Sequence, residues 1–261
     1  MVSIIIVNYN TKRTTAKCLK SVFAYCTSAK EVIVVDNNSS DGSGEFLEKN
    51  FPSVKILKNK KNLGFARANN QGAAQARGDI LFFLNSDVLI QRNIISVIEE
   101  DLYQYNNRGV AAPSLLTEQR VEQEHSHGDF PGLFSLVVNK LKTGKKKKTK
   151  DGIIETDWVS GAALAVKKRV YDRVGGFDEG FFMYFEDIDL CRRIKDQGYK
   201  VIQDKRISLI HRGGVSFGNA YKKKKQYYYR SQDYYFTKNH GKMATGSLKA
   251  LRYPCKLFKM K

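Results

Sequence analysis

Cysteine is scarce in this sequence and shows no paired spacing. The 261-residue chain has four cysteines, Cys18, Cys26, Cys191 and Cys255, and no two of them have the Cys-x-x-Cys spacing of zinc or thiol-redox sites. Four cysteines in a chain of this length do not build a disulfide scaffold, so we expect reduced thiols.

Long apolar runs are missing as well. No stretch reaches the roughly 18 apolar residues that a transmembrane helix needs. Residues 1–10 contain a short apolar run with no basic region before it, which is typical of a buried strand and not of a signal peptide. Because hydrophobic residues make up 42% of the chain, we expect a globular protein. Because neither a transmembrane nor a signal-like segment is seen, we expect it in the cytoplasm.

Acidic residues are nearly absent from two segments that carry most of the net charge of +19. Residues 140–150 hold seven Lys and no acid, and residues 221–261 hold twelve basic residues and one acid, Asp233. A charge of this size favours a polyanionic partner, either nucleic acid or an anionic membrane surface. The other residues are nearly neutral, so the charge says little about the chemistry of the main body.

Strand and helix patterns alternate through the first half of the chain. Strands are expected at 2–8, 31–35, 54–58 and 80–84, and helices at 12–27, 43–50, from Gly64 to about 76, and at 91–105. This alternation predicts an α/β fold, with an open, mostly parallel, Rossmann-like sheet covered by helices on both faces. Ligands bind at the carboxyl ends of the strands in such sheets, and Tyr9, Asp36 and Asp87 each follow a strand.

The second half has a less regular pattern. Residues 113–155 are polar and predict long loops around the lysine run. We expect a strand at 158–166, helices at 167–175 and 186–197, one or two strands over 199–211, and a basic helix from residue 221.

Asn85, Ser86 and Asp87 end a predicted strand and form a candidate metal site. Strand alternation places residues 85 and 87 on the same side, where two oxygen ligands could hold Mg²⁺ or Mn²⁺ against a diphosphate. The alternative is an ordinary Asn/Ser/Asp turn.

His211 also ends an apolar strand, which makes it a candidate third metal ligand or a structural histidine. His125, His127 and His240 have no comparable setting in the sequence.

Two further residues suit a nucleotide. Asp36 follows an apolar strand, where a carboxylate can accept a hydrogen bond from a base imide or a ribose hydroxyl, although the segment is equally good turn chemistry. Arg67 lies in the first turn of a helix, which suits phosphate, or else it is a surface arginine.

Glu186, Asp187 and Asp189 stand at the start of a predicted helix. Acids are favoured there by capping and by the helix dipole. These acids also follow a run of aromatic residues, and a carboxylate walled by aromatic rings can have a raised pKa and act as a general base.

Taken together, several segments resemble family 2 glycosyltransferases with the GT-A fold, most of all the bacterial rhamnosyltransferase group. The matching segments, in chain order, are VSIIIVNYN, VIVVDNNSSDGS, NLGFARANNQG, GDILFFLNSDV, DWVSGAALAVKK, VGGFDEGFFMYFEDIDLCRR and the strand ending at His211. The resemblance implies a nucleotide-sugar-binding half at 1–110, an acceptor-binding and catalytic half at 111–220, and a basic aromatic helical tail at 221–261.

The resemblance implies roles for the strand-end residues of the first half. Asn8 and Tyr9 close the first strand in the nucleotide site, where Tyr9 would pack on the base. Asp36 would hydrogen-bond the base imide, and Arg67 would approach the base or the diphosphate.

The family's metal site, an Asp-x-Asp motif, corresponds to Asn85–Asp87. Because Asn85 replaces the first Asp, Asp87 becomes the main carboxylate ligand of Mn²⁺ or Mg²⁺, and Asn85 offers only a neutral carbonyl. His211 matches a metal or diphosphate contact found in part of the family.

The remaining roles concern transfer itself. The segment with Trp158, Ser160 and Gly161 resembles the lining of the donor-sugar and acceptor pocket. Glu186 and Asp187 match the acidic pair that supplies the base, usually its second member. Asp187 would deprotonate an acceptor hydroxyl, whose oxygen attacks the anomeric carbon from the side opposite the nucleoside diphosphate, so the anomeric centre inverts.

The donor implied is a UDP- or dTDP-sugar, with dTDP-rhamnose first by resemblance, and the acceptor a glycan or lipid-linked glycan of a cell-surface polysaccharide. A catalytically degenerate relative is the alternative that Asn85 suggests. A nucleic-acid-binding module is disfavoured because the strand-end acids would repel phosphate and no nucleic-acid motif is present.

The basic tail suggests an anionic membrane as a partner. Helical spacing places Tyr228, Gln232, Tyr235 and Phe236 near one face, and residues 248–258 have a partly apolar side formed by Leu248, Leu251, Leu257 and Phe258. We expect an interfacial helix on the inner face of the cell membrane, or alternatively a solvated lysine-rich surface.

Overall fold

The computed structural model of this chain describes residues 1–26, 30–132, 149–213 and 221–257. Its strands are β1 (Val2–Asn8), β2 (Lys30–Asp36), β3 (Lys55–Lys58), β4 (Ile80–Asn85), β5 (Val88–Leu89), β6 (Arg108–Leu116), β7 (His127–Gly128), β8 (Ile153–Thr156), β9 (Trp158–Val159), β10 (Ala163–Lys167) and β11 (Lys200–His211). Its helices are α1 (Lys12–Tyr25), α2 (Ser43–Asn50), α3 (Phe65–Ala74), α4 (Ile95–Tyr103), α6 (Lys168–Arg173), α7 (Glu186–Asp196) and α8 (Tyr221–Leu257). Most of the lysine-rich segment 140–150 lies outside the described residues.

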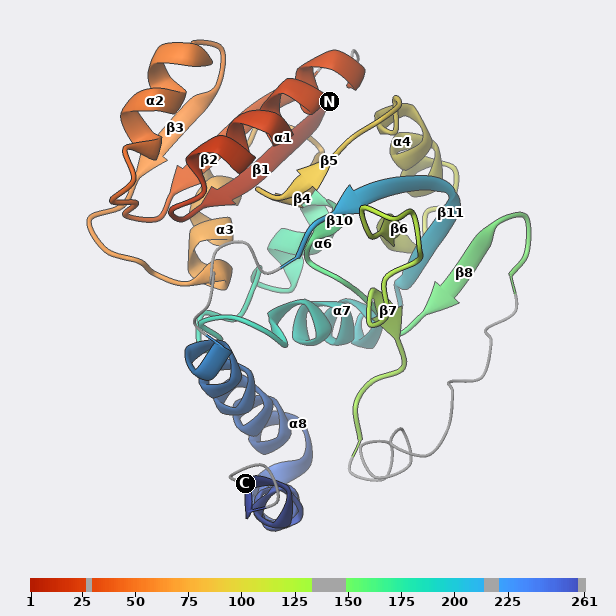
Figure 1. Cartoon of the computed structure of the whole chain (residues 1–261). Helices are drawn as coiled ribbons and strands as arrows, with labels where there is room; N and C mark the ends of the chain where they lie inside the picture. The colour runs from red at the N-terminus through yellow and green to blue at the C-terminus, as the bar shows by residue number, and fades with distance from the viewer. Residues whose placement is uncertain (27–29, 133–148, 214–220, 258–261) are drawn as a thin grey trace.

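A nine-stranded sheet, counted over the described residues, forms the centre of the molecule (Figure 1). Its order is β3-β2-β1-β4-β10-β6-β11-β5, and β8 pairs with β11 beside this path. The pairs β3–β2, β2–β1, β1–β4 and β6–β11 are parallel, whereas β10 is antiparallel to both β4 and β6. The parallel strands predicted from the sequence, β1 to β4, therefore come from the first half of the chain. In the sheet, β10 links them to β6 and β11.

The central strands are largely apolar because helices cover both faces of the sheet. Ile4 and Ile6 of β1 pack with α1, α2 and α4, and Ile5 packs on the opposite face with α3, α6 and α7. Because successive side chains of a strand point to opposite faces, an uninterrupted apolar strand requires cover on both sides. The expected helices on both faces are confirmed.

Strand β6 was missed by the sequence analysis, which assigned residues 113–155 to loops. It lies between β10 and β11 in the sheet, and it crosses the boundary at residue 110 that separates the two predicted halves. Pro113 explains the weak signal, because proline cannot donate a ladder hydrogen bond and rarely occurs within a central strand. The pairing with β11 shifts its register after Asp204, the residue opposite Pro113, so a local irregularity accommodates the missing donor.

Helix α8 is not one straight tail. Gly241 has φ 84° and ψ 170°, and it interrupts the helix. The segment after this break folds back, because Leu248 packs with Tyr235 and Phe236, and the Arg252 guanidinium pairs with Asp233. Figure 1 shows α8 in blue beside α7, with the last helical segment turned at the bottom of the view.

In the described part of the chain, every helix is too short or too polar to cross a membrane.

Candidate active site

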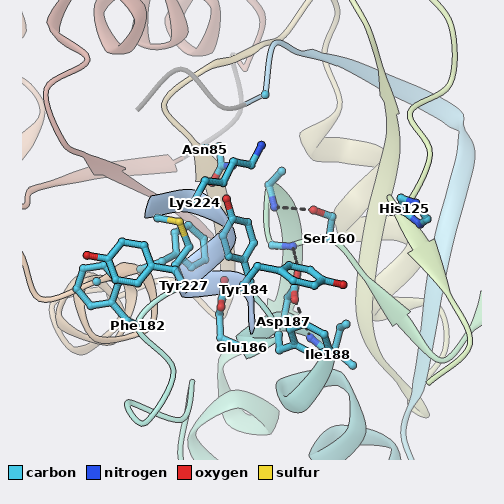
Figure 2. A pocket seen from close by; sticks show the side chains of 18 of the residues that line it. Asn85, His125, Ser160, Phe182, Tyr184, Glu186, Asp187, Ile188, Lys224 and Tyr227 are labelled. Carbon is cyan, nitrogen blue, oxygen red and sulfur yellow. Dashed lines mark hydrogen bonds between the residues drawn. The ribbon is translucent and has the colours of Figure 1, made fainter. Parts of the chain in front are cut away.

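A cavity of about 1140 Å³ opens where the chain leaves the carboxyl ends of β1, β2 and β4. Tyr9, Asn37 and Asp87 line it from the sheet side, Asp187 lines it from the start of α7, and residues of α8 close another wall (Figure 2). Small-ligand pockets are typically about 300–1,000 Å³, so this volume has room for two substrates at once. The position agrees with the rule that ligands bind at the carboxyl ends of strands in open α/β sheets.

The three predicted metal ligands meet at one side of this cavity. His211 Nε2 lies 3.3 Å from Asp87 Oδ1 and 3.4 Å from Asn85 Nδ2. β5 brings them together, because Val88 and Leu89 pair with His211 and Ile210 of β11 directly after the Asn-Ser-Asp turn.

Gln123 fixes the orientation of His211, and the sequence analysis did not single it out. Its side-chain amide donates to the His211 carbonyl oxygen at 2.5 Å, and its Oε1 lies 2.8 Å from Nδ1. Since Oε1 can only accept, Nδ1 carries the proton, and in the neutral imidazole the Nε2 lone pair faces Asp87 and Asn85.

The donor set fits a divalent cation. An imidazole nitrogen and a carboxylate oxygen 3.3 Å apart, each presenting a lone pair, suit an ion bound between them. Within the described residues no group of three or more His, Cys, Asp or Glu side chains could hold a metal. Mg²⁺ and similar ions are often held by one or two protein ligands with substrate phosphates completing the shell, which agrees with so small a set.

The acidic pair at the start of α7 faces the same cavity. Tyr184 and Phe185, which precede it, have φ values of 71° and 70°, a left-handed conformation that bulky residues rarely adopt. The neighbouring helix α8 holds this bend, since Tyr228 contacts both rings and the Ser231 hydroxyl donates to the Met183 carbonyl at 2.7 Å. Such strain persists only where the surroundings enforce it, and here it turns the chain into α7 beside the cavity.

The two carboxylates have different surroundings. Each oxygen of Asp187 accepts one backbone N–H, Oδ2 from Gly161 and Oδ1 from Ile188, both at 2.9 Å (Figure 2). Glu186 is buried, and its Oε2 has no hydrogen-bond partner among the described residues. Asp187 is partly exposed and receives two backbone hydrogen bonds, whereas Glu186 is buried.

Burial raises the pKa of both carboxyl groups. For Glu186 the pKa lies well above its ordinary value because of burial first and the charge of Asp187 second. Burial also raises the pKa of Asp187, and the N–H groups of Gly161 and Ile188 oppose that rise. A carboxylate with a raised pKa is a better proton acceptor at neutral pH than an ordinary one.

Gly161 lies close to its neighbours at this contact. A Cβ at Gly161 would lie 3.3 Å from the Phe65 ring, which would have to move slightly, and 3.4 Å from the Cβ of Asp187. Trp158 and Ser160, the other two residues of the predicted sugar pocket, also line the cavity.

At the carboxyl ends of β1 and β2, Asn8 and Asp36 lie together but do not line the cavity. Asn8 Nδ2 donates to Asp36 Oδ1 at 2.6 Å, and Asn8 Oδ1 accepts from the Thr11 and Thr15 hydroxyls. Both residues are buried. Asn8 therefore fixes Asp36 at the strand end, while Tyr9 lines the cavity itself.

Arg67 does not join the cavity. It lies in the first turn of α3 as expected, but its Nε pairs with Glu179 at 3.3 Å, and its side chain is 55% exposed. The surface alternative fits this placement, because a guanidinium engaged with a carboxylate on the outside of α3 has no access to a ligand in the cavity.

Residues 3–174 match Glycosyl transferase family 2. The chain belongs to this family.

Relatives of this family 2 chain include Low-salt glycan biosynthesis hexosyltransferase Agl10 of Haloferax volcanii, 24% identical over 80% of this chain and 66% of the relative. Rhamnosyltransferase WbbL of Escherichia coli is 29% identical over 57% of this chain and 60% of its own length. N-acetylglucosaminyl-diphospho-decaprenol L-rhamnosyltransferase of Mycobacterium tuberculosis is 24% identical over 72% of this chain and 68% of the relative. The chain thus spans about two thirds of the length of these curated relatives.

Solved structures show the same fold. Mannosyltransferase PcManGT from Pyrobaculum calidifontis, in complex with GDP-Man and Mn²⁺, is similar with a TM-score of 0.63 at 18% identity. The match covers 89% of this chain and 61% of the PcManGT chain. GalNAc-T7 with UDP, GalNAc and Mn²⁺ has a TM-score of 0.66 at 16% identity over 97% of this chain and 53% of its own. The predicted GT-A fold is confirmed.

Several cavity residues of this family 2 chain escaped the sequence analysis. Gln123 and His125 line the cavity, although His125 was expected to have no functional setting. Both come from the segment that was assigned to loops, and no local pattern marks them. Asn37 follows Asp36 directly and could have been found by that position alone. Its side-chain amide donates to Asn62 Oδ1 at 2.9 Å and to the Gly64 carbonyl at 3.1 Å, which holds the loop that precedes α3.

Proposed function

We propose that the protein is an inverting glycosyltransferase that moves a sugar from a nucleoside diphosphate donor to a hydroxyl of a glycan or lipid-linked glycan. One observation carries the proposal. A carboxylate held by two backbone N–H groups, Asp187, lines the same cavity as the Asp87–His211 pair, which suits a divalent cation. This arrangement offers a base for the acceptor and a place for the donor diphosphate within one cavity.

The proposed reaction is a single displacement. Asp187 takes the proton of the acceptor hydroxyl, the acceptor oxygen forms a bond to the anomeric carbon, and the bond from that carbon to the diphosphate oxygen breaks on the opposite side. The nucleoside diphosphate leaves with the electron pair of that bond, and the anomeric configuration inverts. A well-placed base contributes roughly 10²–10⁴-fold to such a step.

Mn²⁺ or Mg²⁺, held by Asp87 and His211, would neutralise charge on the departing diphosphate. Asn85 presents its amide nitrogen to His211, so it contributes an oxygen only when that amide turns over. The Mn²⁺ bound in the similar structures of PcManGT and GalNAc-T7 supports this cofactor.

The donor we propose first is dTDP-rhamnose. Two of the relatives are named as rhamnosyltransferases. These names support a deoxyhexose as the donor sugar, and a cell-surface polysaccharide or a lipid-linked glycan as the acceptor. UDP-sugars are the second choice.

Substitution of Asp187 tests the proposal. The wild-type protein, with Mn²⁺ and a panel of dTDP-, UDP- and GDP-sugars, should release nucleoside diphosphate and glycosylate an acceptor. Asp187→Asn should abolish transfer while dTDP or UDP still raises the melting temperature. Asp196→Asn, an exposed acid on the same helix, should leave both unchanged. Near-wild-type turnover by Asp187→Asn would remove the assigned base, and a wild type that binds nucleotide without any transfer would favour a degenerate relative.

We also propose an anionic membrane surface as a partner of α8. Lys222, Lys242 and Lys249 are exposed there, and Met243 and Leu251 on its last segment are 90% and 54% exposed. Tyr235, Phe236 and Gln232, expected on the membrane face, are buried within the protein, which corrects that part of the expectation. Flotation with phosphatidylglycerol vesicles should be lost in K222Q/K242Q/K249Q, and equal flotation would rule out the lysines as the contact.

A further inference from the structure

Three lysines of α8 form one edge of the cavity. Lys223, Lys224 and Lys225 line it, and so do Tyr227, Tyr228 and Tyr229. Each lysine precedes a tyrosine by four residues, so each pair shares a helix face, about 6 Å apart along the axis. We call these residues the lysine row, 223–225, and the tyrosine row, 227–229.

The cavity side of α8 differs from its outer side. Lys222, Gln226 and Arg230 repeat every four residues, are exposed, and do not line the cavity. The lysine-rich start of α8 is therefore divided, with part of its charge directed to the cavity and part to the surroundings.

The two rows have different neighbours. The tyrosine row is occupied by protein, since Tyr227 stacks on Phe182 with ring centres 4.6 Å apart and Tyr228 contacts Tyr184 and Phe185. The lysine row has no carboxylate within ion-pair distance among the described residues, and the Lys225 ammonium lies 5.7 Å from the centre of the Tyr229 ring. Its positive charge is left for a ligand.

Two carboxylates of the cavity are engaged by other groups and do not pair with the lysine row. Asp87 lies against His211, and both oxygens of Asp187 accept backbone N–H groups. In the view of Figure 2, Lys224 lies on the same side of the cavity as Asn85, with Asp187 on the other side.

We propose that the lysine row binds a phosphate group of a substrate, separately from the cation site at Asp87 and His211. Ammonium groups with no protein partner, gathered at the edge of a cavity, suit a phosphate oxygen by charge and by hydrogen bonding. The phosphate belongs to the donor diphosphate or to a phosphorylated acceptor. This inference rests on the proposed function for its place in the reaction, but the binding itself is measurable without turnover.

The test uses two full-length variants with equal loss of charge. K223Q/K224Q/K225Q removes the lysine row, and K17Q/K20Q/K49Q removes three exposed lysines of α1 and α2 that do not line the cavity. Affinity for inorganic pyrophosphate is measured by calorimetry in EDTA, so that no cation contributes. We expect at least a tenfold loss in the first variant and less than a twofold change in the second. Equal affinity in the first variant, or an equal loss in both variants, would overturn the proposal.

Two further arms distinguish the source of the phosphate. If the donor supplies it, the variant should lose affinity for UDP or dTDP but not for the nucleosides uridine and thymidine. If the acceptor supplies it, nucleotide affinity stays constant, and the KM for a phosphorylated acceptor rises while that for its dephosphorylated form does not. A wild type without transfer activity would count against the proposed function alone. An active wild type matched by the variant in every arm would count against the lysine row alone.

Discussion

At the residue scale, the orientation of His211 depends on a side chain outside the predicted site. Gln123 holds the histidine at its carbonyl oxygen and at Nδ1, and this fixes which nitrogen faces Asp87. Partners of this kind typically change metal affinity by about 10–100-fold when they are removed.

We predict that Gln123→Leu lowers Mn²⁺ affinity by about tenfold. Without Oε1 the imidazole can place its proton on either nitrogen, so the form that binds the cation is less populated. The measurements are Mn²⁺ binding by electron paramagnetic resonance and the ¹⁵N shifts of His211, which report the tautomer directly. Glu122→Gln is the matched control, because Glu122 pairs with Lys205 at 3.0 Å and does not touch His211. Unchanged Mn²⁺ affinity in Gln123→Leu would contradict the role.

A second prediction at this scale concerns the pH dependence of transfer. A base acts only when deprotonated, and burial raises the pKa of both Glu186 and Asp187. The acidic limb of kcat/KM should therefore lie above the ordinary carboxyl pKa of about 4. Because the charge of Asp187 contributes to the raised pKa of Glu186, Glu186 keeps its proton while Asp187 titrates, and Glu186→Gln should leave that limb in place. A limb that moves to lower pH in Glu186→Gln would show that Glu186 is charged while Asp187 titrates.

At the element scale, the loop before α7 is held from two directions. Tyr227 and Tyr228 of α8 pack against it on one side. On the other side, Phe65 at the start of α3 donates its N–H to the Phe182 carbonyl at 2.7 Å. The base thus depends on helices that are distant from it in the sequence.

We predict that Gly64→Ala is more damaging than an ordinary left-handed glycine substitution. Gly64 has φ +83°, and a Cβ there would lie 2.4 Å from the Phe182 carbonyl oxygen. Gly241 has φ 84° and ψ 170°, close to the 83° and 178° of Gly64, with nothing within 4 Å, so Gly241→Ala measures the backbone strain alone, of order 1–3 kcal/mol. Chemical unfolding of both variants should give a greater loss for Gly64→Ala, accompanied by reduced turnover because the loop must move. Equal losses in the free energy of unfolding would show that the Phe182 carbonyl can move away from residue 64 without cost.

At the scale of the whole molecule, a buried ionic cluster joins α4, β6 and β11 away from the cavity. Asp101 pairs with Arg108 and Arg206, each at 3.1 Å, and Arg206 also pairs with Asp204. Burial, followed by the hydrogen bond and the charge of Asp204, raises the pKa of Asp101 to about 7.

This cluster predicts how stability depends on pH. The folded state keeps a proton on Asp101 that the unfolded chain, with a pKa of about 3.9, has already lost. Its contribution to the free energy of unfolding is therefore fully present below pH 4 and is lost as the pH rises through 7. Asp101→Asn removes this titration, so the decrease in melting temperature between pH 5 and pH 8 should be smaller than in the wild type. The same decrease in both proteins would assign the effect to other groups.

The sequence determined much of the first half by itself. Its apolar strands and intervening helices are local patterns, and the residues at the carboxyl ends of parallel strands gather at one edge by geometry alone. Asn85, Asp87 and His211 were found in this way, and Glu186 and Asp187 were found by their place at the start of a helix after an aromatic run.

Only the tertiary structure decided the rest, because the deciding contacts join distant parts of the chain. Strand β6 has a weak local signal and is held in place by β10 and β11 on either side. Arg67 has the right local setting for phosphate, but Glu179 engages it on the surface. Gln123, His125 and the lysine row reach the cavity through contacts that no spacing in the sequence records. A local pattern shows which structure a segment prefers, whereas a site is fixed by which segments share the same space.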